Sequence, residues 1–223
     1  MQQIKDIFMN QYKEHNIIRT LKVNEKEHKT FLFDTAKEMC NKDYIFTPQH
    51  KVVMNLLFNY FTGSEKCENL NLNLNKGILL VGNPGSGKTL IMNLFKFYTY
   101  QLGFNSFQMH QAQSIITQCN ITGVQHLDNY GLTVHNPITC YIDDIANTNE
   151  SINNFGTKIN VIEHLLDLRH LVLMNRRKLT HVSTNIYPAA MEASKIYDSR
   201  IISRFAEMFN VIELVTDKDF RKP

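Results

Sequence analysis

Residues 82–89 have the types and spacing needed to hold phosphate groups. They read Gly-Asn-Pro-Gly-Ser-Gly-Lys-Thr and match the pattern G-x-x-x-x-G-K-[ST] in full. The glycines let the backbone curl so that several N–H groups point at phosphate oxygens, and the helix that follows adds the positive end of its dipole. We expect Lys88 to reach the β- and γ-phosphates of a nucleotide and Thr89 to offer its hydroxyl to Mg²⁺. The residues expected to contact the nucleotide here are Gly82, Asn83, Pro84, Gly85, Ser86, Gly87, Lys88, Thr89 and Leu90.

A pair of acids follows the apolar run at 139–142, where a metal site beside the phosphate loop would need one. Asp143 and Asp144 are adjacent, and burying two carboxylates is costly unless a cation or a water network satisfies them. We assign Asp143, together with Thr89, to the Mg²⁺ site and Asp144 to orienting the attacking water. Taken without the phosphate loop, the pair would equally fit a solvated strand end.

An asparagine and three arginines are further candidates. Asn185 ends a short strand pattern and could position the attacking water; its alternative role is to cap the next helix. Arg200 and Arg204 share a helix face, from which an arginine could reach the γ-phosphate of a neighbouring subunit. The alternative for Arg204 is a surface ion pair, for instance with Glu207. Arg221 could fold back onto the nucleotide or belong to a solvated tail.

Length and composition bound what the rest of the chain can be. The 223 residues are 43% hydrophobic and 20% charged, as is typical of a globular domain and not of a disordered or collagen-like chain. The net charge of +3 permits contact with nucleic acid without arguing for it. We expect no membrane helix and no signal peptide. The cysteines are widely spaced, which favours buried, reduced thiols in a cytoplasmic protein over a zinc site or disulfides.

Strand and helix patterns alternate along most of the chain. The expected strands cover residues 77–81, 105–109, 139–142, 179–183 and 211–215. The expected helices cover 47–62, 88–102, 111–130 with a break near Gly123, 158–174 and 187–208, with polar loops at 64–75 and 145–157. This alternation predicts an α/β fold, in which helices flank both faces of a parallel sheet. Residues 1–45 would form a short helical extension, and residues 46–223 the phosphate-binding domain.

The order of these elements resembles that of the AAA+ ATPases, a class of P-loop NTPases, and among them the DnaC/IstB-like family of helicase loaders and transposition helpers. The matching stretches are KGILLVGNPGSGKTLIMNLF, YIDDIA, NNFGTKINVIEHLLDLRH, STN, YDSRIISRFAEMFNVIEL and DFRK, within roughly residues 46–222. The resemblance implies ATP and Mg²⁺ as cofactors. It also implies that Lys88 and Thr89 bind the nucleotide and the metal, and that Asp143 and Asp144 are the acid pair. Asn185 matches the sensor residue that follows a strand. Arg204 matches the arginine finger, and Arg221 matches the second sensor.

Two departures from the broader AAA+ pattern stand out. Asp144 occupies a position where glutamate is usual, and because its side chain is one methylene shorter, turnover would be slow. The sequence leaves room only for a short tail after the last strand, so we expect no full carboxy-terminal lid domain, as in the loader group.

The resemblance also implies partners. It points to a homo-oligomer that assembles on ATP binding and acts on single-stranded DNA with a replicative helicase, or with a transposase in the transposition role. Candidate DNA contacts are Arg176, Arg177, Lys178, Lys158 and Phe155, although residues 176–178 are more simply explained as a solvated connection before a strand. Two rival functions stay open. A small P-loop kinase would need a lid with several cations and an acceptor pocket, whereas a nucleotide-gated clamp would bind ATP with little turnover.

Overall fold

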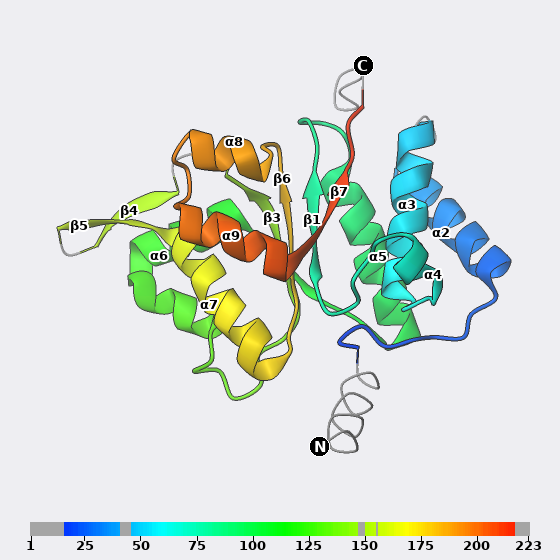
Figure 1. Ribbon diagram of the computed structural model, residues 1–223, viewed down its shortest axis with the longest axis horizontal. Coiled ribbons are helices and arrows are strands. Elements are labelled where there is room, and N and C mark those ends of the chain that lie inside the picture. Colours follow the sequence, from blue (N-terminus) through cyan, green and yellow to red (C-terminus); the bar gives the residue numbers. More distant parts are fainter. Residues whose placement is uncertain (1–15, 41–45, 147–149, 155, 217–223) are drawn as a thin grey trace, which may run out of the picture.

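A parallel sheet forms the centre of the molecule (Figure 1). The computed structural model describes residues 16–40, 46–146, 150–154 and 156–216, and within them the strands follow the order β2-β3-β6-β1-β7, each parallel to its neighbours. These strands are β1 (Gly77–Val81), β2 (Gln108–Gln111), β3 (Cys140–Ile145), β6 (Thr180–Thr184) and β7 (Phe209–Glu213). β1 is buried along its whole length, which explains its continuous apolar run.

Helices cover both faces of this sheet (Figure 1). One face carries α2 (Glu25–Met39), α3 (Pro48–Phe61), α4 (Lys66–Asn69) and α5 (Lys88–Leu102). The other carries α6 (Ala112–Thr122), the 3₁₀ helix η1 (Val124–Tyr130), α7 (Val161–Arg176), α8 (Pro188–Ala193) and α9 (Ser199–Met208). Side chains of both layers join those of the sheet in one buried apolar cluster. The predicted α/β fold, a parallel sheet with helices on both faces, is confirmed.

Capping side chains set where several helices begin. Thr47 starts α3, and its hydroxyl accepts from the backbone N–H three residues later at 3.3 Å. Asn160 and Asp198 cap α7 and α9 in the same way, at 3.1 Å and 2.8 Å. Each cap satisfies a backbone donor that the first turn of a helix leaves unpaired. The predicted start of α3 at Thr47 and Pro48 is therefore confirmed.

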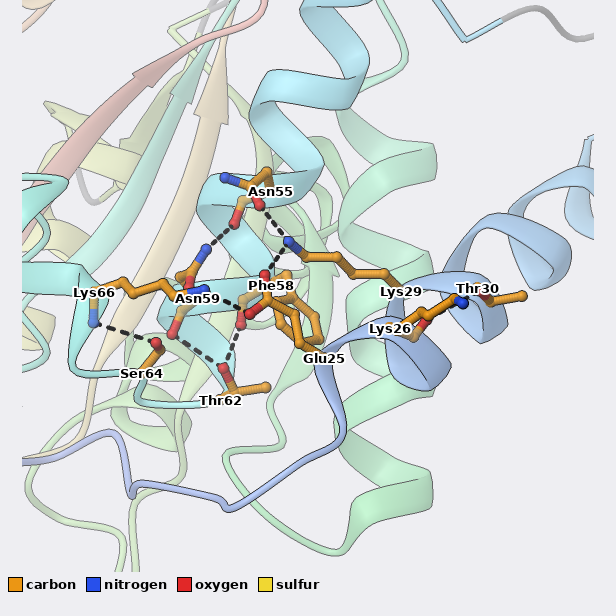
Figure 2. Close-up of polar contacts among 10 residues, drawn as sticks. All are labelled: Glu25, Lys26, Lys29, Thr30, Asn55, Phe58, Asn59, Thr62, Ser64 and Lys66. Carbon is orange, nitrogen blue, oxygen red and sulfur yellow. Dashed lines mark hydrogen bonds and ion pairs between the residues drawn. The ribbon is translucent and has the colours of Figure 1, made fainter.

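The helix α2 packs against the domain through its apolar face. Leu32 is 2% exposed and belongs to the same cluster as side chains of α3 and α5. At the first turn of α2, Glu25 accepts from Lys29 and from Lys66 of α4, while Lys29 also donates to Asn55 of α3 at 2.7 Å (Figure 2). The two ammonium groups, that of Lys29 first, lower the pKa of Glu25 to about 2. Because such exposed ion pairs contribute about 1 kcal/mol or less, the apolar contacts dominate this packing.

The prediction of a polar loop at 145–157 is wrong in part, because a hairpin lies there. β4 (Ser151–Asn154) pairs antiparallel with β5 (Thr157–Asn160), and in Figure 1 the pair lies at the edge of the molecule beside α6. Ile152 is 6% exposed and anchors the hairpin. One buried residue in a polar run is too weak an alternation to predict a strand.

Other boundaries differ from the prediction for local reasons. The predicted helix at 187–208 is divided into α8 and α9, because Lys195 has a φ of +53° and Asp198 caps a new helix. β2 begins later than predicted, because Asn105 has a φ of +52° and its amide donates to the carbonyl of Phe61. The predicted loop at 64–75 contains the short helix α4, and the helix predicted from 158 begins after β5. The break near Gly123 is confirmed.

The cysteines are buried, as predicted. Cys40, Cys67, Cys119 and Cys140 all carry free thiols. Burial raises the pKa of Cys67 to about 11, which keeps this thiol protonated and unreactive near neutral pH. Among the residues that the structure describes, no helix has the length and apolar character needed to cross a membrane.

Candidate nucleotide-binding site

A cavity of about 430 Å³ lies where β1 leads into α5. The residues that line it are Gly85, Ser86, Gly87, Lys88, Thr89, Leu90, Gln111, Asp143, Asp144 and Asn185. The cavity thus brings together the phosphate loop, the acid pair and Asn185, which are far apart in the sequence. They meet because the carboxyl ends of neighbouring parallel strands lie at one edge of the sheet.

Glycines give the loop its shape. Gly85 and Gly87 have φ angles of +75° and +92°, which residues with a Cβ rarely adopt. A Cβ on Gly82 would lie 2.1 Å from the carbonyl oxygen of Leu214, so only glycine fits against the residue that follows β7. Gly87 directly precedes α5, so the positive end of this helix lies at the cavity wall.

Lys88 extends along the phosphate loop and is 7% exposed. Its Nζ donates to the carbonyl oxygens of Gly82 at 2.6 Å and Asn83 at 3.1 Å, and to Oδ1 of Asn185 at 2.6 Å. A charged phosphate oxygen is a stronger acceptor than a carbonyl or amide oxygen. The ammonium group can therefore exchange these contacts for a nucleotide phosphate.

Asp143 is held by donors on both of its carboxylate oxygens and is 3% exposed. Oδ2 accepts from the hydroxyl of Thr89 at 2.8 Å and from Nε2 of Gln111 at 2.9 Å. Oδ1 accepts from the hydroxyls of Tyr141, at 2.6 Å, and Ser183. Hydroxyl and carboxylate oxygens are ligands that Mg²⁺ prefers. The Thr89–Asp143 pair therefore fits a Mg²⁺ ion, and the other donors fix the direction of the carboxylate.

Ser86 tests the fit to phosphate independently. Its hydroxyl is buried and forms no hydrogen bond with any of the described residues. A buried polar group without a partner costs about 1–3 kcal/mol, and a phosphate oxygen bound in the loop would relieve that cost. The loop fits phosphate through this hydroxyl as well as through its glycines and lysine.

Asp144 faces the cavity because the backbone departs from a regular strand there. The register between β3 and β6 shifts after Ile142, and Asp144 has a φ of +64°. Adjacent residues of a regular strand point to opposite faces, so this bulge is what lets Asp143 and Asp144 line one cavity. The N–H of Asp144 donates to Oγ of Ser183 at 2.9 Å, and its Oδ1 accepts from Nδ2 of Asn185 at 3.1 Å.

Asn185 thus contacts both Lys88 and Asp144. It does not cap the following helix, because α8 begins after Tyr187. Gln111, Tyr141 and Ser183 are contacts of Asp143 that sequence reasoning missed. The sequence could have indicated Gln111, because it is a polar residue at the end of a strand. In the structure it ends β2 directly opposite Asp143.

Arg200 and Arg204 lie away from this cavity. Among the described residues that line it, none comes from α9, which carries Arg200 and Arg204. Arg200 contacts Asp167 of α7 at 3.0 Å, and Arg204 contacts the same carboxylate. The alternative of an ion pair is therefore met for both arginines, but the partner suggested for Arg204 is wrong, because Glu207 pairs with His170 at 2.8 Å. Arg221 lies outside the described residues.

The candidate DNA contacts that the structure describes do not form one cluster. Lys158 lies on β5, just before α7 begins, whereas Arg176 and Arg177 lie where α7 ends. A helix of 16 residues separates these ends by about 24 Å. Arg177 has a φ of +50° and donates to Oδ1 of Asn75 at 3.0 Å. Phe155 lies outside the described residues.

A parallel sheet with a glycine-rich loop between β1 and α5, and an acid pair at the end of β3, defines a P-loop nucleotide-binding protein of the AAA+ type. The family described as P-loop containing dynein motor region matches residues 62–216, more than half of the chain. The chain therefore belongs to this family. Its members are P-loop proteins, which typically bind a nucleotide together with Mg²⁺.

Several solved structures have a similar fold. The structure of DnaI has a TM-score of 0.53 at 15% identity, with 83% of this chain and 93% of that chain covered. A protein from Streptococcus pyogenes serotype M3, assigned as a primosome component, has a TM-score of 0.53 at 16% identity, over 81% of this chain and 87% of that chain. A DNA replication initiation factor has a TM-score of 0.51 at 16% identity, over 81% of this chain but 50% of that chain. This chain therefore spans half the length of the initiation factor, and at such identities the likeness concerns the fold alone. No curated protein sequence matches the chain.

Proposed function

We propose that this protein binds ATP with Mg²⁺ and hydrolyses it in the cavity between β1 and α5. The observation that carries the proposal is the series of contacts from Lys88 through Asn185 to Asp144, beside the Thr89–Asp143 pair. A cation for phosphate, two metal-binding oxygens and a carboxylate for the attacking water thus share the walls of one cavity.

Each side chain has a separate task in this proposal. Lys88 binds the β- and γ-phosphates, while the N–H groups at the start of α5 orient them. Thr89 and Asp143 would hold Mg²⁺, which when bound neutralises charge that develops on the transferring phosphoryl group. Asp144 orients the attacking water and accepts its proton, and the amide of Asn185 holds this carboxylate in place. We expect turnover to be slow, because the aspartate side chain is shorter than the usual glutamate.

We also propose that hydrolysis requires a second copy of this chain. Arg204, with Arg200 beside it, pairs with Asp167 outside the cavity of its own subunit. Phosphate carries more charge than a carboxylate and accepts paired bonds from a guanidinium, so either arginine could exchange Asp167 for the γ-phosphate of a neighbour. For Arg221 we propose the role of second sensor that the resemblance implies.

The biological role that we propose is that of a helicase loader in DNA replication, which forms an ATP-dependent oligomer with single-stranded DNA and a replicative helicase. The fold similarity to DnaI and to the primosome component from Streptococcus pyogenes serotype M3 supports this role. The alternative functions differ in how they use ATP or in their partner. A clamp binds ATP with little turnover, a kinase transfers the phosphate of ATP to an acceptor, and a transposition helper acts on a transposase.

ATP hydrolysis, measured against protein concentration with and without single-stranded DNA, tests this proposal. We expect the rate per subunit to rise with both. Lys88→Ala should abolish nucleotide binding and hydrolysis, and Lys96→Ala, which removes an exposed cation from the same helix, should leave them unchanged. A rate indifferent to concentration and DNA would contradict the oligomeric site. Tight binding without hydrolysis would instead identify a clamp. Transfer of phosphate to an added acceptor would identify a kinase, and capture of a transposase in place of a helicase would identify a transposition helper.

A further inference from the structure

Glu150 is a buried carboxylate with no part in the mechanism above. It is 4% exposed. Its Oε1 accepts from the backbone N–H of Ala146 at 2.7 Å, and its Oε2 accepts from the hydroxyl of Tyr197 at 2.8 Å. One oxygen therefore holds the segment that follows β3, and the other holds the segment that precedes α9. Its own carbonyl accepts from the N–H of Val161 at 2.9 Å, which fixes Glu150 to the start of α7.

The contact with Ala146 stabilises an unusual backbone next to Asp144. The φ angles of Asp144 and Ala146 are +64° and +60°, and each such angle costs a residue other than glycine about 1 kcal/mol or more. Ser183 holds one end of this short segment through the N–H of Asp144, and Glu150 holds the other through the N–H of Ala146. Ala146 is 3% exposed, so the loss of Glu150 would leave a buried donor without its acceptor.

The contact with Tyr197 connects the same carboxylate to the arginine helix. Tyr197 is 2% exposed, and its ring centroid lies 6.2 Å from that of Phe205 on α9. The next residue, Asp198, caps α9, and its N–H donates to Oε1 of Glu163 on α7 at 2.8 Å. The start of α9 is therefore anchored on two carboxylates, and one of them, Glu150, also holds the backbone beside Asp144.

We propose that Glu150 is a positioning residue of the hydrolytic site. It keeps the Asp144 carboxylate in the geometry that hydrolysis needs and ties this geometry to the start of α9. A neighbouring subunit that displaces Arg204 and its helix would change the position of Asp144 through Tyr197 and Glu150. This inference rests on the proposed function, because the position of Asp144 matters only if Asp144 orients the water.

Three substitutions separate the two contacts of Glu150. Glu150→Gln keeps an oxygen for Ala146 and an amide that can donate to the oxygen of Tyr197, so it preserves both contacts. Glu150→Ala removes both. Tyr197→Phe removes the contact with α9 and leaves that with Ala146. For each full-length variant, the measurements are kcat for ATP, the affinity for a fluorescent ATP analogue, the melting temperature, and hydrogen exchange of the Ala146 amide without nucleotide.

We expect Glu150→Ala to lower kcat about tenfold to a hundredfold, the cost of a small displacement of a catalytic group, without changing nucleotide affinity. The Ala146 amide should exchange faster in this variant. Glu150→Gln should restore both kcat and the protection of this amide. Tyr197→Phe should lower kcat less than Glu150→Ala and leave the Ala146 amide protected. If Glu150→Ala does not fold, the other two variants carry the test.

Several results would overturn the inference. The inference fails if Glu150→Ala and Tyr197→Phe both have the kcat of the wild type. It also fails if the Ala146 amide exchanges at the wild-type rate in Glu150→Ala. A parallel fall in kcat and nucleotide affinity would indicate general loss of structure and would also overturn it. If the wild-type protein does not hydrolyse ATP, the proposed function fails and this inference fails with it. Wild-type hydrolysis that Glu150 and Tyr197 do not influence would overturn the inference alone.

Discussion

The Nζ atom of Lys88 lies 2.6 Å from Oδ1 of Asn185, at the point where β6 ends. The amide nitrogen of the same asparagine donates to Asp144. A single side chain therefore contacts both the cation that we propose for the phosphates and the carboxylate that we propose for the attacking water. In the proposed mechanism, a γ-phosphate that binds the ammonium group would release the amide of Asn185 from Lys88, and this amide would pass the presence of the phosphate on to Asp144.

Asn185→Ala should separate hydrolysis from binding. The substitution removes an oriented amide but leaves the phosphate loop and the Thr89–Asp143 pair intact. We therefore expect kcat to fall about a hundredfold, as for the loss of one oriented hydrogen-bond donor, with a smaller change in nucleotide affinity. Steady-state kinetics and equilibrium binding with a fluorescent ATP analogue check this. An equal loss in both quantities would argue against a role in orientation.

Thr89→Ala should make nucleotide binding insensitive to Mg²⁺. The Thr89 hydroxyl is one of the two protein oxygens that we propose for the metal, and it lies 2.8 Å from the other, Oδ2 of Asp143. We expect the affinity for ATP in Mg²⁺ to fall by about tenfold or more, with little change when EDTA removes the metal. Titrations of ATP with and without Mg²⁺ check this, and Thr89→Ser serves as the control that keeps the hydroxyl. A similar loss in both conditions would place the metal elsewhere.

Arg204→Ala should be rescued by a second inactive variant if the site is shared between subunits. An Arg204→Ala subunit keeps its own Lys88 and Asp144, whereas an Asp144→Asn subunit keeps its own Arg204. Each alone should lose most activity, about a thousandfold for a missing arginine finger. A mixture of the two should hydrolyse ATP faster than either alone, because some interfaces combine the intact halves. Because Arg204 also pairs with Asp167, Asp167→Asn is the control for loss of that ion pair. A mixture no faster than the sum of its parts would contradict the shared site.

The free energy of unfolding should depend on pH through Glu150. Burial raises the pKa of this carboxyl from 4.5 to about 7, assisted by the charges of Asp144 and Glu163 and opposed by donation from Tyr197 and Ala146. Because the folded pKa is raised, the group favours the folded state below about pH 4.5, and this stabilisation is lost as the pH rises through about 7. The whole change amounts to about 3 kcal/mol at most.

Urea unfolding of the wild type and of Glu150→Gln across this pH range measures that contribution. Other titrating groups affect both proteins equally, so the difference between their free energies of unfolding isolates Glu150. We expect the stability of the wild type relative to the variant to fall between about pH 4.5 and about pH 7. Parallel pH profiles would show that this carboxyl does not titrate in that range.

The sequence predicted most of what depends on local patterns. The phosphate loop needs glycine at fixed positions, and a short apolar run before such a loop is typical of a buried strand, so the loop and its flanking elements could be predicted from the sequence. Both acids near the end of β3 could also be assigned to the site, but the backbone geometry that brings them together could not be predicted. Asp143 and Asp144 line one cavity only because of a bulge that involves β6, and nothing in the run Tyr-Ile-Asp-Asp signals it.

Contacts between side chains that are distant in the sequence could not be predicted either. The pairing of Arg204 with Asp167 depends on how α7 and α9 pack, and a partner was easier to guess within α9, where Glu207 lies. The sequence assigns no role to Glu150, because a single acid in a polar run is typical of a solvated loop. Its burial follows from the fold that α7, β3 and the residues before α9 form around it.

Whether this cavity hydrolyses ATP is tested by the rate of hydrolysis with saturating Mg²⁺ and ATP, compared between the wild type and Asp144→Asn. We expect measurable hydrolysis by the wild type and a loss of about a hundredfold or more in the variant, with nucleotide affinity retained, because the substitution removes only the carboxylate that we propose as the proton acceptor. Asp128→Asn, which changes an exposed acid on η1, should leave the rate unchanged. Equal rates in the wild type and Asp144→Asn, or no hydrolysis by the wild type, would contradict the proposed function.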